Sequence, residues 1–549
     1  MSTSGQTRQT GLKKQGVAAH LSLLLPSFIA VAVLGTLSPS AARDYKVSGG
    51  ITTGYEFYDR QYEKEEVSEK ASDETGESTT TTATTTAATA TTQKDDSYNR
   101  LRVAPLIIVN SSSARDELSF RYSPGFYYDT ETSDHDIDHN LNAAYKYSLT
   151  RHWQLKLTER YLLTDKNIVD SNETESSTTT ESQTMAENAE PLADNNGRRR
   201  YWTNDLGFVS EHTYLEDSLF SFGYTFGILE NIDTAPESTY ENYNRHSAQV
   251  SLGHRFDSIW KLTTSGNYVR GLYDTPAEEE ETDSEDATTN KDLSEYRALT
   301  SLESRLIEHN PLSLAYSFAA IDYDADDQAT VALHDVTGGW QWEISKEFTV
   351  NLGAGPSFQK TEGQSGNWGY NANAKVRYAL ERGALELSAN RGYAIENFTG
   401  TNENGLREFW QSRLGFDYTI LENLSFKLFT TYRNEDREEI TERRLAQTEV
   451  QTEAQTEPQT QTQSDTSTVT EAEAATETPP EEQQFITETA VFNRQQYGAG
   501  TSLGYKFGQW YSMNLSYNYL QQDSEQVDDS YDEHRLILSL SVEKDLLNW

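Results

Sequence analysis

The stretch NLNAAYKYSLTRHWQLKLTERYLL, residues Asn140 to Leu163, holds two runs in which apolar and polar residues alternate. The first run has apolar residues at every second position from Leu141 to Leu149, and the second resumes at Trp153 after a short polar turn. Because successive side chains on a β-strand point to opposite faces, each run has one apolar and one polar face. The stretch therefore predicts a β-hairpin whose two faces meet different surroundings.

The composition favours a membrane barrel over a soluble protein. The 549 residues include no Cys, 32 Tyr, 20 Phe and 9 Trp, with a formal net charge of −42. Absence of Cys excludes disulfides, thiol catalysis and Cys-based metal sites. A hydrophobic fraction of 35% is low for a soluble chain of this length. It suits a barrel in which every second strand residue faces lipid, and abundant Tyr suits the aromatic girdles at membrane interfaces.

The N-terminus has the pattern of an export signal. A basic segment precedes a mostly apolar run over 17–37, and small residues Ser40-Ala41-Ala42 follow it. We predict a cleaved signal peptide over residues 1–42. The alternative is a membrane-anchoring helix, which Pro26 disfavours. After Arg43 no apolar run approaches the roughly 20 residues of a spanning helix, so the pattern predicts a protein of the cell outer membrane.

The hairpin pattern recurs almost to the last residue. One opening strand near 45–58, nine hairpins and one closing strand near 534–542 predict an all-β fold. It is a transmembrane antiparallel up-and-down β-barrel of about 20 strands, with eighteen or twenty-two as alternatives. Turns inside hairpins are short and most connections between hairpins are longer. In bacterial barrels such turns are periplasmic and such loops extracellular, which places both termini in the periplasm.

Residues 43–549 are thus predicted to form one barrel interrupted by long low-complexity loops at 60–97, 165–196, 274–295 and 434–490. These segments are rich in Thr, Ser and Glu and have too little apolar surface to fold, so we expect disordered loops. The alternative is a surface brush that repels, masks or binds divalent cations.

Three hairpins carry a family resemblance: YKYSLTRHWQLKLTERY, FDYTILENLSFKLFTTY and LGYKFGQWYSMNLSYNY. They resemble the β-barrel porins found with exopolysaccharide and PEP-CTERM (exosortase) gene systems. The resemblance covers the mature chain apart from the loops, and the long Thr- and Glu-rich insertions depart from it. It implies an outer-membrane pore, with polysaccharide export or assembly as its context.

The chain shows no sign of an enzyme site. Gly-x-Ser-x-Gly occurs once, over 500–504, but inside a predicted strand and not at the strand-to-helix turn of a nucleophile elbow, and the chain lacks a His-Glu-x-x-His pair and a phosphate-binding Gly-rich loop. The densest cluster of metal-ligand types runs from His135 to His139, with Asp136 and Asp138 on the opposite face of a strand. A metal at a loop mouth is conceivable there, but a solvated strand end is the favoured interpretation. We predict no catalytic residue, no metal site and no cofactor.

The polar strand faces are rich in cations. We predict that eleven of them face the lumen: Arg100, Arg102, Arg121, Lys146, Lys156, Arg160, Arg305, Lys375, Arg377, Arg413 and Lys427. The acids with the same orientation are fewer, namely Glu303, Glu343, Glu386, Asp417 and Glu543. Unpaired cations that line a pore favour anions. The alternative is that these cations pair with lumen acids or with loops.

The sequence thus favours a porin-like channel for small or anionic solutes or acidic exopolysaccharide. The alternatives are a structural or adhesive surface barrel with a closed lumen and, less favoured, an outer-membrane enzyme. The expected partners are outer-membrane lipid, lipopolysaccharide and the barrel-assembly machinery. No nucleic acid is expected as a partner.

Overall fold

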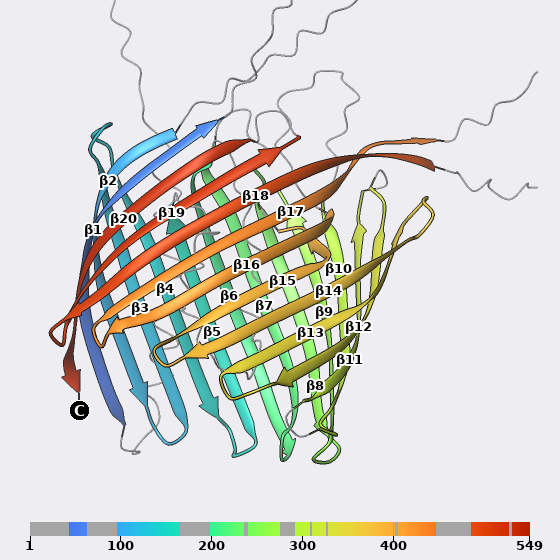
Figure 1. Ribbon diagram of the computed structural model, residues 1–549, viewed down its shortest axis with the longest axis horizontal. Helices are drawn as coiled ribbons and strands as arrows, with labels where there is room; N and C mark the ends of the chain where they lie inside the picture. Colours follow the sequence, from blue (N-terminus) through green and yellow to red (C-terminus); the bar gives the residue numbers. More distant parts are fainter. Residues whose placement is uncertain are drawn as a thin grey trace, which may run out of the picture.

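A computed structural model describes residues 43–62, 96–164, 198–234, 240–274, 291–307, 310–325, 328–398, 400, 405–445, 485–525 and 530–548. Twenty strands of this part of the chain form one antiparallel sheet (Figure 1). The sheet is closed, because β1 (Asp44–Tyr62) pairs with both β2 (Asp96–Ser112) and β20 (Tyr531–Asn548). No helix in the described part is long and apolar enough to cross a membrane.

Each strand pairs with the next one along the chain, which confirms the predicted up-and-down barrel of twenty strands. The remaining strands are β3 (Asp116–Asp129), β4 (His135–Ser148), β5 (Trp153–Thr164), β6 (Arg198–Leu215), β7 (Ser218–Thr234), β8 (Tyr243–Arg255), β9 (Trp260–Tyr273), β10 (Leu293–Ser304), β11 (Leu312–Tyr323), β12 (Val331–Glu343), β13 (Phe348–Thr361), β14 (Asn367–Leu380), β15 (Gly383–Glu396), β16 (Gly405–Leu421), β17 (Leu424–Leu445), β18 (Phe485–Phe507) and β19 (Tyr511–Ser524).

The largest departures from the predicted bounds occur where strands enter the predicted loops. β17 and β18 stay paired from Leu424↔Tyr505 as far as Leu445↔Phe485, well inside the predicted loop 434–490. β1 and β2 likewise extend into 60–97, and β10 begins inside 274–295. Ladder hydrogen bonds need no apolar side chains, so a strand continues where hydrophobic alternation has ended. Loop 165–196 and the signal segment 1–42 lie outside the described residues.

The closing strand is also longer than predicted. It reaches Asn548 and passes through Lys544 and Asp545, where the alternation of apolar residues stops. A register shift in its pairing with β1, between Val47 and Ser48, inserts Leu546 as an extra residue. Such a bulge changes which residues share a face, and this explains the broken alternation.

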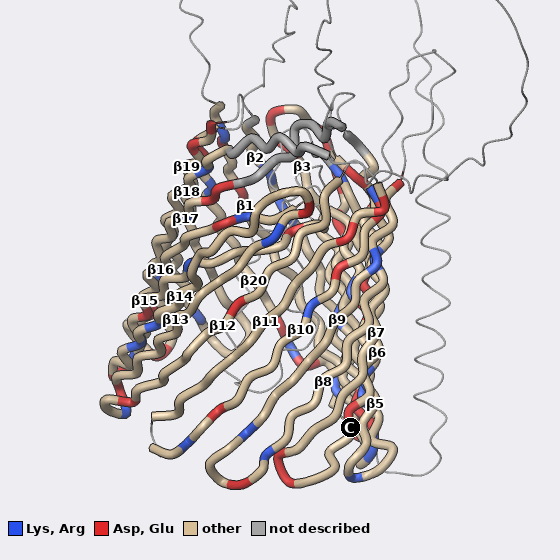
Figure 2. The backbone as a smooth tube through the Cα atoms, turned by 90° about the vertical axis from the view of Figure 1, so that its right-hand side faces the viewer, with Lys and Arg blue, Asp and Glu red and all other residues tan. Residues whose placement is uncertain are grey.

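Apolar side chains cover the outer face of the barrel. Leu101, Val103 and Ile107 of β2 are 41–50% exposed, and the same alternation recurs on the other strands. Five of the seven exposed tryptophans in the described residues lie near the short turns: Trp153, Trp260, Trp340, Trp342 and Trp510. Charged residues of both signs occur at both rims (Figure 2). An apolar band with an aromatic border is the surface that a lipid bilayer requires.

Candidate functional site

The wall of the barrel splits between β14 and β15. Their ladder runs from Leu380↔Gly383 up to Ala372↔Arg391 and then stops. Above that point β14 pairs only with β13, and β15 pairs only with β16 up to Glu396↔Gly405. In Figure 1 the upper ends of β15 and β16 lie near β10, while β14 continues towards the rim. We call residues 392–398 and 405–409 the tucked hairpin.

The tip of the tucked hairpin is anchored to the inner wall. Asn397 and Phe398 are 0% and 2% exposed. The Tyr243 hydroxyl donates a hydrogen bond to the Phe398 carbonyl at 3.2 Å, and the Tyr273 hydroxyl donates to the Asn397 carbonyl. The Asn397 amide donates to the buried Glu295 carboxylate at 2.5 Å. These bonds satisfy the backbone of a turn that lies inside the barrel.

An apolar layer forms between the tucked hairpin and the wall. Ile395 and Leu406 lie on the same strand face as Leu387 and Leu414, which are exposed on the outer surface lower down. Above the split this face packs against buried apolar side chains of the inner wall: Leu229, Tyr243, Val269, Tyr273, Leu293, Ile321, Val331 and Leu333. The hairpin therefore lies inside its neighbouring strands and narrows one side of the lumen.

Two glycines permit this close approach. A Cβ on Gly271 of β9 would lie 2.8 Å from the Phe398 ring. A Cβ on Gly369 of β14 would lie 2.6 Å from the Tyr393 hydroxyl. Any larger residue at either position would push the hairpin away from the wall.

A row of cross-strand partners crosses the inner face and ends beneath this hairpin. The row comprises Arg121, Asn142, Arg160, Asp205, Gly227 and Arg245 on β3 to β8, and we call it the basic row. Its members alternate with exposed apolar residues such as Phe126 and Leu206, so they lie on the opposite, inner face.

The two ends of the basic row differ in their contacts. The Arg245 guanidinium lies 3.2 Å from the Asp205 carboxylate and 5.4 Å from the centre of the Phe398 ring. Arg121 and Arg160 are exposed, and neither forms an ion pair within the described residues. Strand spacing places these two residues about 10 Å apart. Arg121 and Arg160 therefore lie on an exposed part of the inner wall. The basic row leads from there to the side of the lumen that the tucked hairpin narrows.

The eleven predicted lumen cations fall into three groups. Five form ion pairs: Arg100–Asp129 (3.8 Å), Lys146–Glu117 (3.7 Å), Lys156–Glu211 (2.8 Å), Arg305–Glu303 (2.7 Å) and Lys375–Glu386 (2.8 Å). Two lie over aromatic rings: Arg102 over Tyr127 and Arg413 over Phe429. Arg121, Arg160, Arg377 and Lys427 are exposed and have no ion pair in the described part of the chain.

Arg305 needs a correction. The sequence pattern places it on a strand, but β10 ends at Ser304 and Arg305 lies in the following turn, where its amide donates to the Ile259 carbonyl. The predicted acids also miss several carboxylates, among them Glu117, Asp129 and Glu211. Glu117 faces Lys146 and Asp129 faces Arg100 in the register, so strand pairing is the signal that would have found them.

The opposite wall holds its charges in a closed network. Arg407 of the tucked hairpin lies 2.6 Å from Glu396 and 3.6 Å from Glu435. Arg433 contacts the same two carboxylates. The Arg407 and Glu435 side chains are only 7% and 5% exposed. Low exposure strengthens these pairs, and it also removes the charges from contact with a passing solute.

The cluster from His135 to His139 is divided between two faces. Asp136 pairs with Arg200, and Asp138 accepts a hydrogen bond from Thr164 at 3.1 Å. The His139 Nδ1 instead lies 2.9 Å from the Tyr122 hydroxyl. Among the described residues no group of three or more His, Asp or Glu side chains is arranged to hold a metal ion.

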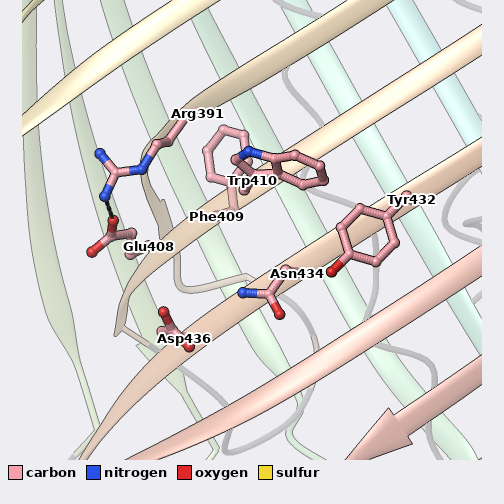
Figure 3. A pocket seen from close by; sticks show the side chains of 7 residues that line it. All are labelled: Arg391, Glu408, Phe409, Trp410, Tyr432, Asn434 and Asp436. Atoms are coloured by element: carbon pink, nitrogen blue, oxygen red, sulfur yellow. Dashed lines mark hydrogen bonds and ion pairs between the residues drawn. The ribbon is translucent and has the colours of Figure 1, made fainter.

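A cavity of about 350 Å³ lies at the split, on the outer side of the tucked hairpin (Figure 3). Arg391 and Glu408 form an ion pair on one side of it, and Trp410 and Tyr432 stand on the other, with ring centroids 4.8 Å apart. The cavity holds both charged and aromatic groups, unlike the apolar outer face below it.

No protein-family model matches the sequence, and no curated protein matches it. Solved barrels align with most of the chain. OccK2 (OpdF) of Pseudomonas aeruginosa in complex with glucuronate aligns at 12% identity and a TM-score of 0.38, over 92% of this chain and 98% of its own. The siderophore receptor PirA of Acinetobacter baumannii aligns at 10% identity and 0.43, over 91% and 80%. OccAB3 of Acinetobacter baumannii aligns at 9% and 0.38, over 91% and 99%.

Proposed function

We propose that this protein is an outer-membrane channel for small anionic solutes. The observation that carries the proposal is the basic row, where exposed Arg121 and Arg160 lie on the inner face without ion pairs to any described residue and lead towards the tucked hairpin. Two supports come from the barrel itself. Its outer face is apolar, and barrels of 16–18 strands already enclose an aqueous channel. The tucked hairpin packs against one side of the lumen and leaves the inner face of β3–β5 exposed.

The physical argument concerns the field at the narrowed side. Two cations about 10 Å apart, on a wall of low dielectric constant, concentrate positive potential over the path of a solute. An anion gains from both charges as it passes. The bound state stays weak, because exposed arginines remain hydrated and release the anion again.

The test is reversal potential across planar bilayers in a KCl gradient. Wild-type protein should conduct and prefer chloride. Arg121→Gln with Arg160→Gln should lose most of that preference. The matched control is Lys156→Gln with Glu211→Gln, because it removes a paired cation together with its partner. The preference should also fall as KCl rises, because the Debye length shrinks from about 10 Å at 0.1 M to about 3 Å at 1 M. A folded barrel that does not conduct would favour the structural or adhesive alternative.

The resemblance suggests a carboxylated exopolysaccharide as cargo, and the spacing of Arg121 and Arg160 supports it. A polyanion can contact both arginines at once, whereas a single uronate contacts one. Glucuronate oligomers should therefore block chloride current at lower carboxylate concentration than glucuronate itself. Equal block by monomer and oligomer would remove the polymer from the proposal and leave the small-anion channel intact.

A further inference from the structure

Histidines that are far apart in the sequence repeat one arrangement on the outer face. In four places a tyrosine hydroxyl lies 2.7–2.9 Å from a histidine Nδ1. The pairs are Tyr122–His139, Tyr224–His246, Tyr316–His334 and Tyr517–His534. Three of these tyrosines are 39–43% exposed, on the same face as the outward apolar residues. We call the four pairs the Tyr–His girdle.

The four pairs occupy equivalent positions. Each histidine is the fourth or fifth residue of its strand, on β4, β8, β12 and β20. Each histidine lies directly opposite a residue of the preceding strand, and these opposite residues are Pro124, Phe226, Phe318 and Tyr519. The tyrosine of each pair is two residues before that opposite residue. Three of those opposite residues place a ring 5.0–5.1 Å from the imidazole. The arrangement therefore recurs on every fourth strand from β4 to β20 except β16.

The girdle lies near the rim that carries the long loops. On β12 the chain runs from His334 to the exposed Trp342 at the short-turn rim. These residues are about 26 Å apart along the strand, which a tilt of 35–45° reduces to about 20 Å of depth. The apolar band of such barrels is about 25 Å tall. The imidazoles therefore stand close to the boundary between the lipid chains and their headgroups.

The position on β16 that completes the four-strand repeat shows what the girdle requires. Glu408 is the fourth residue of β16, its opposite residue is Tyr393, and it pairs with Arg391, two residues before Tyr393. The geometry is the same, but an ion pair replaces Tyr–His. This is the hairpin that is tucked inside the wall, where Arg391 and Glu408 border the cavity of Figure 3. The Tyr–His pair is thus present at the four positions near the lipid boundary. It is absent at the position on β16, where the hairpin leaves that boundary.

The chemistry of the pair leaves one donor on the imidazole ring. When the tyrosine hydroxyl donates to Nδ1, the neutral imidazole carries its proton on Nε2. A donor at the headgroup boundary finds anionic phosphate oxygens, and such charge-assisted hydrogen bonds are the strong ones. We propose that the Tyr–His girdle binds the phosphates of outer-leaflet lipid, the phosphorylated glycolipid of the bacterial outer membrane.

The proposal is tested by lipid retention. Wild-type protein and variants are reconstituted with lipid A that carries both phosphates, or with the same lipid after phosphate removal, and bound lipid per barrel is counted by native mass spectrometry. Wild type should retain the phosphorylated lipid preferentially. The fourfold variant His139→Phe, His246→Phe, His334→Phe and His534→Phe should lose that preference by about tenfold, the loss expected for one charge-assisted contact.

Two controls keep the test specific. His254→Phe removes a pair of the same kind, Tyr214–His254 at 3.0 Å, which lies at the short-turn end of β8. This control uses protein extracted from native membranes, where the glycolipid borders only the long-loop rim, so His254→Phe should retain as much of it as wild type. The second control is His→Asn at the four girdle positions. Tyr55 and Asn99 already form the same diagonal contact at 2.5 Å, so the fold should tolerate asparagine, and its amide keeps a donor that preserves part of the retention.

The outcomes are distinct. Equal retention of both lipids by wild type would overturn the proposal, and so would full phosphate preference in the fourfold phenylalanine variant. If the girdle instead contacts a second copy of the chain, the fourfold phenylalanine variant would change the cross-linked oligomer and leave lipid retention unchanged. That result would also overturn the lipid proposal. If the variant fails to fold, the wild-type comparison of the two lipids still decides. Chloride selectivity should not change in any variant, so this proposal and the channel proposal can fail separately.

Discussion

The two sides of the lumen hold positive charge differently. On β3–β5, Arg121 and Arg160 are exposed and lack ion pairs within the described residues. On β15–β17, Arg407 and Arg433 are enclosed by Glu396 and Glu435. The first wall presents charge to solutes, and the second uses charge to hold the tucked hairpin against its neighbour. The number of inward cations is therefore a poor guide to the field in the lumen, because the partners of each cation decide which wall acts on a solute.

The largest expected effect comes from breaking the paired wall. Arg407→Met should destabilise the barrel by about 3–5 kcal/mol, because it leaves Glu396 and Glu435 in a poorly hydrated site with one cation fewer to balance them. Urea unfolding in detergent measures the loss. Adding Glu396→Gln should recover part of it, since the double variant carries one buried negative charge fewer. Arg121→Met, on the open wall, is the matched control and should change stability little. An equal loss in both variants would remove the distinction between the walls.

A comparable loss of stability is expected from releasing the tucked hairpin. Phe398→Ala removes a fully buried ring, which costs about 3–5 kcal/mol in a packed site. The tip should then detach from β8–β10 part of the time, and single-channel current should rise and become noisier. Phe416→Ala, on the other half of β16, is the control and should leave the current unchanged. A current that stays quiet and unchanged in Phe398→Ala would mean that the hairpin does not narrow the path.

The alternation of Leu141, Tyr145 and their neighbours was enough to predict the strands, their number and the closed barrel, because burial of one face leaves a period of two in the sequence. The tucked hairpin has the same period. Ile395 and Leu406 continue the apolar face of Leu387 and Leu414, and alternation cannot tell a face against lipid from a face against another wall. Only the interrupted β14–β15 ladder reveals the difference.

The basic row and the girdle were missed for a second reason. Members of a Tyr–His pair are 17–22 residues apart, and neighbours along the basic row are 18–45 residues apart, so neither forms a motif. Each depends on register across several strands. In the register between neighbouring strands, Arg160 faces Asp205 and His246 faces Phe226. Sequence reasoning therefore found the cations of the lumen, whereas pairing was needed to show which of them are free.

The smallest effect, and the sharpest form of the comparison, lies within one strand. Lys375 and Arg377 are two residues apart on the inner face of β14, but Lys375 lies 2.8 Å from Glu386 and Arg377 has no ion pair in the described part of the chain. Charge count alone predicts equal effects from Lys375→Gln and Arg377→Gln. If partners decide, Arg377→Gln should lower chloride preference, whereas Lys375→Gln should lower it more by freeing Glu386, a carboxylate that repels the anion. Lys375→Gln combined with Glu386→Gln should then return close to the wild-type preference, because two uncharged side chains replace an ion pair of zero net charge.

Reversal potentials in dilute KCl measure the chloride preference of wild type, the two single variants and the double variant. A double variant that stays as cation-preferring as Lys375→Gln would show that the pair does not cancel, and that free and paired cations act alike on the solute.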